Sequence, residues 1–211
     1  MVPANSLGAF AVASFLLLII PGPAVIYVLN RSVSDGRNVA LSAVAGLECG
    51  NFMHVIAASA GLSAVLAASS TAFNTVKWCG AIYLIFIGAR TLLRRPATMA
   101  ASLTTMAPRK AFIQGFVVNT LNPKVALFFL SFLPQFIDPE QGAAWFQALV
   151  LGLVFVAIGC VTDSAYALTA SSLRTVLLRG RALPFVQRWV AGSVFIVLGL
   201  VAGTASAGSN K

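Results

Sequence analysis

Long apolar runs separated by short polar segments make up most of this chain, and charged residues fall almost only at the ends of those runs. A helix needs about 20 apolar residues to cross a hydrocarbon core about 30 Å thick. Each run reaches that length, so the pattern predicts an all-α integral membrane protein with six transmembrane helices. The expected ranges are 7–30, 39–68, 73–93, 111–136, 145–172 and 187–207.

Two of these predicted helices contain residues that interrupt a helix. Pro21-Gly22-Pro23 lies in the first, and Asn122-Pro123-Lys124 lies in the fourth. Proline lacks a backbone N–H group and clashes with the preceding turn, so we expect both helices to kink or break there. A lysine near the bilayer centre costs roughly 2.5 to 3.5 kcal/mol on insertion scales. A proline and a lysine at one point of a membrane helix therefore indicate a polar cavity.

Two other predicted helices each contain one acidic residue, Glu48 in the second and Asp163 in the fifth. If these two and Lys124 faced lipid, the summed penalty would be about 8 to 10 kcal/mol, comparable with the stability of a whole domain. We therefore expect them to face one another or water, either as a structural ion pair or as parts of a proton pathway. Polar residues one helical turn away extend the same faces. They are Asn51, Tyr166 and Thr120.

The order of the interruptions and acids predicts an internal repeat. Pro23 in the first helix corresponds to Pro123 in the fourth, and the acid-bearing second helix corresponds to the fifth. A unit of three helices crosses the membrane an odd number of times, so its copy enters in the opposite sense. The sequence thus predicts one membrane domain, 1–211, in which repeat 7–93 and inverted repeat 111–207 are joined by a basic cytoplasmic link, 94–110. Interrupted helices at matching positions of such repeats point to a transporter's substrate site.

Composition excludes a soluble globule, because 59% of the residues are hydrophobic, only 9% are charged and the mean hydropathy is +0.91. The formal net charge of +9 indicates membrane topology rather than nucleic-acid binding, because the basic residues gather in alternate connections. They are Arg31, Arg37, Arg90, Arg94, Arg95, Arg109, Lys110, Arg174, Arg179, Arg181 and Arg188. By the positive-inside rule this side faces the cytoplasm, where it attracts anionic lipid, and both termini lie outside.

The motifs taken together resemble one family of transporters. In chain order they are Pro21-Gly22-Pro23, the stretch from Gly46 to Asn51 with His54, Lys77-Trp78 with Gly80, Tyr83 and Gly88, Asn122-Pro123-Lys124, and Asp163 with Tyr166. In this order and spacing, across essentially the whole chain, the sequence resembles the LysE/RhtB family of amino-acid exporters, and its homoserine/threonine branch more than its basic amino-acid branch. The resemblance implies a multi-pass protein of the bacterial inner membrane that expels an amino acid, driven by the proton or ion gradient.

From the residues and the resemblance we predict alternating access around a central cavity. Half-helix N-termini and Lys124 would hold the substrate carboxylate, and Glu48 or Asp163 would hold its ammonium group. Exchange of a proton by one carboxylate would be coupled to release of the amino acid, and His54 is a second candidate proton carrier. The predicted substrate-binding residues are Pro21, Gly22, Pro23, Asn51, Asn122, Pro123, Lys124 and Tyr166, and the predicted proton-coupling residues are Glu48, Asp163 and His54.

Other classes of function have weaker signatures. A conduit for electrons through intramembrane thiols is one alternative, since Cys49 and Cys160 lie in related positions of the two halves, but neither adjoins a second cysteine. An inorganic-ion transporter is another, although one histidine and two separated carboxylates make a thin coordination sphere. The sequence contains no GxxxxGKS/T or GxSxG motif, so we expect no enzyme, cofactor or resident metal. Small-residue faces such as 57–64 would allow helices to associate closely, including those of a homo-oligomer.

Overall fold

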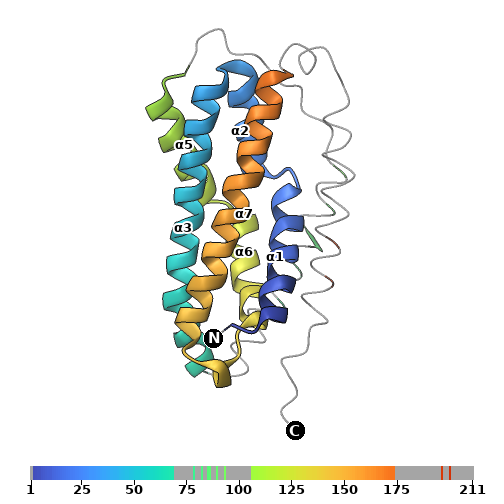
Figure 1. Ribbon diagram of the computed structural model, residues 1–211, viewed down its shortest axis with the longest axis vertical. Coiled ribbons are helices and arrows are strands. Elements are labelled where there is room, and N and C mark those ends of the chain that lie inside the picture. The colour runs from blue at the N-terminus through green and yellow to red at the C-terminus, as the bar shows by residue number, and fades with distance from the viewer. Residues whose placement is uncertain are drawn as a thin grey trace.

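A computed structural model gives the fold of the protein for residues 2–68 and 106–173, with a few isolated helical positions between 78 and 93 and at 196 and 200. The secondary structure of these described residues is entirely helical, and the helices run side by side along one long axis (Figure 1). The elements are α1 (Ala4–Ile19), α2 (Pro23–Ser34), α3 (Arg37–Ala68), α5 (Pro108–Thr120), α6 (Pro123–Ser131), η1 (Leu133–Phe136), η2 (Pro139–Gln141) and α7 (Ala144–Ser172).

Two pairs of consecutive helices, α1 with α2 and α5 with α6, are each separated by a short break. The pair α1 and α2 is long and apolar enough to cross a membrane and is bent by 53° at its break, and the chain from α5 to Phe136 is bent by 43°. Helix α1 stops before Pro21, which offers no N–H group, and α2 begins at Pro23, whose fixed φ suits the first helical position. Pro123 begins α6 in the same way. Both predicted breaks are therefore confirmed.

Helices α3 and α7 are continuous and run the length of the bundle (Figure 1). Both are long and apolar enough to cross a membrane without a break. Helix α3 packs most extensively against α5 and α7, and α7 also packs against α1 and α2. In Figure 1, α2 and α5 occupy one half of the length of the bundle, and α1 and α6 occupy the other. Both breaks therefore lie near the middle of the bundle.

Glycines bring α3 close to its two neighbours. A Cβ atom at Gly46 would overlap the backbone of Phe112 in α5, and one at Gly115 would lie 2.5 Å from the carbonyl oxygen of Ala43. Where α3 meets α7, a Cβ atom at Gly152 would also come within 2.5 Å of a neighbouring side chain. Side chains larger than hydrogen do not fit at these distances, so the close approach of the helices requires glycine. Polar side chains on α3, α5 and α7 are thereby brought together near the breaks.

The basic residues of the described helices, apart from Lys124, gather at one end of the bundle. Helix α2 ends, and α3 and α5 begin, at one end, whereas α6 ends and α7 begins at the other (Figure 1). The first end, called the basic end below, carries Arg31, Arg37, Arg109 and Lys110. The second carries Asp138 and Glu140 next to η2. This distribution agrees with the charge pattern used to predict the topology.

The predicted ranges 39–68 and 145–172 match α3 and α7 to within two residues at each end. The range 7–30 was too short at both ends. Helix α1 begins at Ala4, and α2 continues beyond Leu29 as far as Ser34. The break predicted within that range lies at 20–22, where the chain is not helical. The predicted helices 73–93 and 187–207 and most of the link 94–110 lie outside the described residues, so the count of six stays a prediction.

Candidate substrate and proton site

The two helix breaks meet at one buried cavity. Gly22, Ala24 and Val25 at the start of α2 line it, as do Asn122, Lys124 and Val125 at the start of α6. The remaining lining residues are Leu18, Asn51, Asn119 and Asp163. Its volume is about 10 Å³, which is room for one water molecule. Two helix N-termini, each the positive end of a helix dipole, thus open onto the same small polar space.

The carbonyl groups left free where α1 ends are bound by two other helices. Lys124 in α6 donates from Nζ to the carbonyl oxygen of Ile20 at 2.8 Å, and Tyr166 in α7 donates from its hydroxyl to the carbonyl oxygen of Ile19 at 2.6 Å. These carbonyls form the negative end of α1, so the helix dipole as well as the hydrogen bond stabilises an ammonium group there. Lys124 is only 5% exposed and joins the start of one broken helix to the end of the other.

The break between α5 and α6 is held in a corresponding way by α3. The Nε2 atom of His54 lies 2.9 Å from the carbonyl oxygen of Asn119. Because a carbonyl oxygen only accepts, Nε2 carries the proton in this contact. Asn119 follows Ile19 by one hundred residues, so His54 of α3 and Tyr166 of α7 bind carbonyl groups at matching positions of the two breaks.

Glu48 and Asp163 form a buried carboxyl pair between α3 and α7. Their side chains are 6% and 2% exposed, and they lie within hydrogen-bonding reach of one another. Among the described residues, no donor reaches Oε1 of Glu48 or Oδ1 of Asp163. Two ionised carboxylates only accept, so a hydrogen bond between the two groups requires a proton on one of them. Asp163 also interacts electrostatically with Lys124, which lines the same cavity.

A chain of three asparagine amides connects Glu48 to the start of α6. Asn51 Nδ2 donates to Oε2 of Glu48 at 2.9 Å, and Asn119 Nδ2 donates to Oδ1 of Asn51 at 2.6 Å. Asn122 Nδ2 donates to Oδ1 of Asn119 at 3.1 Å, and Oδ1 of Asn122 accepts from the backbone N–H of Lys124. All three asparagines are buried. The carboxyl pair and the break of the fourth predicted helix are therefore parts of one hydrogen-bonded network.

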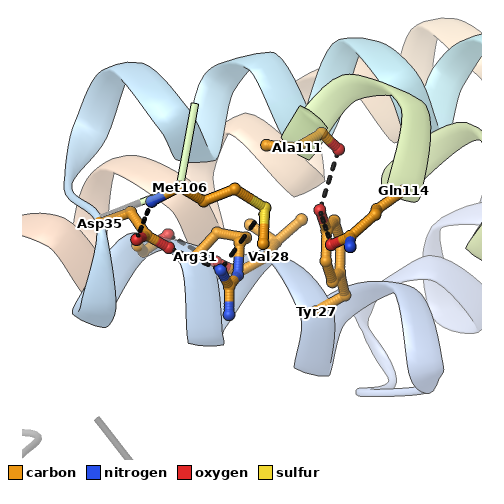
Figure 2. A network of polar contacts seen from close by, with 8 residues as sticks. Tyr27, Val28, Arg31, Asp35, Met106, Ala111 and Gln114 are labelled. Atoms are coloured by element: carbon orange, nitrogen blue, oxygen red, sulfur yellow. Dashed lines mark hydrogen bonds and ion pairs between the residues drawn. The ribbon is translucent and has the colours of Figure 1, made fainter. Parts of the chain in front are cut away.

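At the basic end, polar contacts fasten α2 to the start of α5 (Figure 2). The hydroxyl of Tyr27 donates to the carbonyl oxygen of Ala111 at 2.9 Å. Asp35 accepts from the backbone N–H of Met106 at 2.7 Å and forms an ion pair with Arg31 at 2.8 Å. We call these five residues the basic-end latch. The latch joins the two half-helices that lie between the breaks and the basic end.

On the other side of the breaks, an aromatic cluster fills the bundle. Phe10 of α1, Phe128 of α6, Phe132 directly after α6 and Phe155 of α7 are buried. The ring centroid of Phe128 lies 5.3 to 5.7 Å from those of the other three. The cavity therefore lies between a polar latch and an aromatic core. A solute larger than water enters it only if helices move apart.

The structure brings most of the polar residues that were predicted for the site into one place. Gly22, Asn51, Asn122, Lys124 and Asp163 line the cavity. Glu48 does not line it but contacts two residues that do, Asn51 and Asp163. The predicted clustering of the three buried ionisable groups is therefore present in this structure.

The prolines and the two ring-bearing residues lie elsewhere. Pro23 and Pro123 are exposed on the outside of the bundle, and Pro21 is half-buried, so none of the three lines the cavity. Their contribution is to the backbone, because they end one helix and begin the next. Tyr166 and His54 do not line the cavity and contact backbone carbonyl groups at the two breaks.

Asn119 is a cavity residue that the sequence analysis missed. Helical spacing placed Thr120 on the face of Lys124, but this was wrong because α5 ends at Thr120 and spacing does not continue across a break. The hydroxyl of Thr120 is buried and has no hydrogen-bond partner among the described residues. The sequence signal that could have identified Asn119 was its position three residues before Asn122, directly after a short apolar run.

The cysteines of the described residues do not take part in the site. Cys49 and Cys160 are free thiols with exposed side chains, and neither lines the cavity. Cys79 lies outside the described residues. Within the ranges 2–68 and 106–173, no three His, Cys, Asp or Glu side chains are placed to hold a metal ion.

A bundle of membrane-length helices with two broken spans around a buried, charged cavity is the architecture of a membrane transporter. The chain belongs to the LysE type translocator family, which it matches over residues 15–206. It is 29% identical over 201 residues to a homoserine/homoserine lactone efflux protein of Salmonella typhimurium, covering 93% of this chain and 95% of that protein. A leucine efflux protein of the same organism is 31% identical over 142 residues, covering 65% of this chain and 67% of that protein.

An uncharacterized membrane protein of Vibrio cholerae is 28% identical over 200 residues, covering 94% of this chain and 97% of that protein. No solved structure matches the chain significantly. The family and the named relatives are translocators and efflux proteins rather than enzymes.

Proposed function

We propose that the protein exports a neutral amino acid from the cytoplasm in exchange for protons, by alternating access. The observation that carries this proposal is that Lys124 and Asp163, two buried groups of opposite charge, line one cavity at two helix breaks. The carboxylate and ammonium groups of a zwitterionic amino acid are each bound by one member of such a pair of opposite charges. The relatives named for efflux of homoserine, homoserine lactone and leucine support a small, neutral substrate.

The substrate carboxylate is proposed to bind at the start of α2 and beside Lys124. The first N–H groups of α2 have no side-chain cap, whereas Asn122 already accepts from the first turn of α6, so α2 offers the freer N-terminus. The ammonium group then faces Asp163. The substrate side chain faces the apolar part of the wall, which favours a short or aliphatic side chain over a charged one. That wall is formed by Leu18, Val25 and Val125.

The Glu48–Asp163 pair is the proposed proton site. A substrate ammonium group and a proton are two cations that compete for the same pair of carboxylates. Binding of one therefore weakens binding of the other, and this reciprocal effect couples the two fluxes. His54 is proposed as a second proton carrier through its other ring nitrogen, since Nε2 is bound to the carbonyl of Asn119.

The proposed motion is an exchange between two inverted repeats. Two features support this arrangement: the broken pairs run in opposite directions along the bundle (Figure 1), and His54 and Tyr166 make corresponding contacts at breaks one hundred residues apart. The basic-end latch would open in one state of the cycle and the aromatic cluster in the other. The structure, with both in place, supports a closed intermediate.

We place the protein in the bacterial inner membrane, with the basic end at the cytoplasmic surface against anionic lipid and both termini outside. Large apolar side chains on the outside of the bundle support contact with lipid, and they include Val12, Phe15, Ile56 and Val161. Close-packing faces rich in alanine and glycine support a homo-oligomer.

The test is efflux from proteoliposomes loaded with a panel of labelled amino acids that includes L-homoserine, L-leucine and L-lysine, with and without an acidic exterior. We expect L-homoserine or L-leucine to leave faster than L-lysine, and faster when the exterior is acidic. The matched variant is Asp163→Asn, which is expected to fold but to lose the response to pH. Equal rates from protein-free vesicles, or an undiminished pH response in Asp163→Asn, would contradict the proposal.

A further inference from the structure

We propose that Asn119 is a positioning residue that determines which oxygen of the Glu48–Asp163 pair receives the exchangeable proton. This inference rests on the proposed proton-coupled export. Asn119 contacts neither carboxyl group and acts through the amide of Asn51. Its role follows from the direction in which the chain of three amides donates.

That direction is fixed by backbone groups. An amide side chain can be turned around without a change of shape, so its direction depends on partners that cannot be reversed. Asn119 Nδ2 donates at 2.8 Å to the carbonyl oxygen of Leu47, which can only accept. At the other end of the chain, the N–H of Lys124 can only donate, and it donates to Oδ1 of Asn122. Both anchors impose the same polarity, so every amide donates toward Glu48.

The direction of this amide chain determines which oxygen of Glu48 carries the acid proton. Nδ2 of Asn51 always points at Oε2 of Glu48, and that oxygen accepts whether the group is ionised or protonated. The acid proton is therefore directed to Oε1, which is buried and receives no donor from the described residues. It is then shared with Asp163. The proton can enter and leave without turning any amide, so the network remains intact through the cycle.

Packing leaves Asn119 little freedom to adopt another position. A Cβ atom at Gly50 of α3 would lie 2.9 Å from the Cβ atom of Asn119 and 2.9 Å from the backbone nitrogen of Thr120, so glycine allows α5 to approach α3 here. Asn119 is 1% exposed, and His54 binds its carbonyl oxygen. The backbone and the side chain of Asn119 are therefore both held, as a positioning role requires.

The variant Asn119→Asp reverses the polarity with a minimal change of shape. The new carboxylate only accepts, so it loses the hydrogen bond to the carbonyl oxygen of Leu47, and the amide of Asn51 turns its Nδ2 toward it and its Oδ1 toward Glu48. Glu48 then bonds to Asn51 only by carrying the proton on Oε2, which removes that proton from the contact with Asp163. We expect stimulation of efflux by a pH gradient to fall at least about tenfold, and to fall by a larger factor than exchange of substrate without a gradient.

The experiment uses the full chain in proteoliposomes, with labelled L-homoserine and L-leucine as probes. Counterflow at equal pH measures binding and exchange, and efflux into an acidic exterior measures coupling. Asn51→Asp breaks the same chain one link later and decides the question if Asn119→Asp does not fold. Asn38→Asp, at an exposed position at the start of α3, adds the same charge outside the network and is expected to behave as wild type.

An infrared measurement reports on the chain independently of transport. The C=O stretch of protonated Glu48, identified by its absence in Glu48→Gln, should move to higher frequency in Asn119→Asp because the carbonyl loses the donor Asn51. A loss of the pH response by a larger factor than the loss of exchange, together with the shifted band, supports the proposal. An unchanged pH response, or equal loss of exchange and coupling with the band unshifted, overturns it. If wild type exchanges substrate without any pH response, the proposed coupling fails, while the band still reports on Asn119.

Discussion

Nζ of Lys124 donates a hydrogen bond of 2.8 Å to the carbonyl oxygen of Ile20, which links the first turn of α6 to the last carbonyl of α1. The same ammonium group interacts electrostatically with Asp163. In this structure the protein itself balances the buried positive charge of Lys124. A substrate carboxylate arriving at the cavity would therefore compete with groups of the protein for Lys124.

Replacing Lys124 by methionine tests this role. The change keeps an unbranched side chain, one atom shorter, but removes the charge and the donor to Ile20. We expect efflux to fall at least about tenfold, since a carboxylate would be bound without a counter-charge. Loss of the hydrogen bond to Ile20 and loss of the charge opposite Asp163 both destabilise the fold, so the unfolding free energy should fall by about 3 to 5 kcal/mol.

The measurements are efflux of L-homoserine or L-leucine and thermal unfolding in detergent. Lys110→Met, at an exposed position of the basic end, removes the same charge away from the cavity and serves as the control. Efflux by Lys124→Met equal to that of this control would exclude Lys124 from the substrate site.

Replacing Gly159 by alanine tests the carboxyl pair by steric means alone. A Cβ atom there would lie 2.7 and 2.8 Å from the two carboxylate oxygens of Glu48, closer than such atoms normally come. Glu48 must therefore move, and it cannot keep its contacts with both Asn51 and Asp163. We expect the pH-stimulated part of efflux to fall about tenfold or more, with the helices still folded. Gly61→Ala in α3 meets no atom within 4 Å and is the matched control. Full pH stimulation in Gly159→Ala would show that the position of Glu48 is not critical.

The helix breaks were predictable because proline acts locally. The missing N–H group and fixed φ of Pro21, Pro23 and Pro123 act on their own backbone, so their effect can be derived without knowing any neighbour. Burial of Glu48, Lys124 and Asp163 was also predictable, because the cost of exposing charge to lipid does not depend on the partner found.

Contacts between distant segments were not predictable in this way. The outward position of the Pro23 and Pro123 rings depends on how each half-helix is rotated in the bundle. Asn119 and the latch residues Tyr27 and Asp35 gain their partners 68 to 84 residues away, through close approach of α5 to α3 and α2. Arg31 was considered only as a topological charge, although in the structure it pairs with Asp35.

Replacing Tyr27 by phenylalanine tests the basic-end latch. The change removes the hydroxyl that donates to the carbonyl oxygen of Ala111 and leaves the ring in place. A single hydrogen bond contributes about 1 kcal/mol, which corresponds to roughly a fivefold shift between closed and open forms. A cysteine at Ala24, which lines the cavity, in a background without native cysteines should then react severalfold faster with a membrane-impermeant thiol reagent added at the basic side. Reaction from the opposite side should not accelerate. Equal acceleration from both sides would indicate general loosening rather than a latch.

Replacing Glu48 by glutamine separates the structural and proton-carrying roles of this residue. Glutamine has the shape of a protonated glutamate: its carbonyl oxygen accepts from Asn51, and its NH₂ group donates to Asp163, so the network stays satisfied. Thermal stability and counterflow at equal pH should therefore remain near wild type, while stimulation of efflux by an acidic exterior should disappear. Glu48→Ala instead leaves Nδ2 of Asn51 buried without an acceptor and should lower the unfolding free energy by about 1 to 3 kcal/mol. Glu140→Gln, at an exposed position, controls for the loss of one negative charge. A normal pH response in Glu48→Gln would assign the proton to another group, because an amide cannot release it at any pH used.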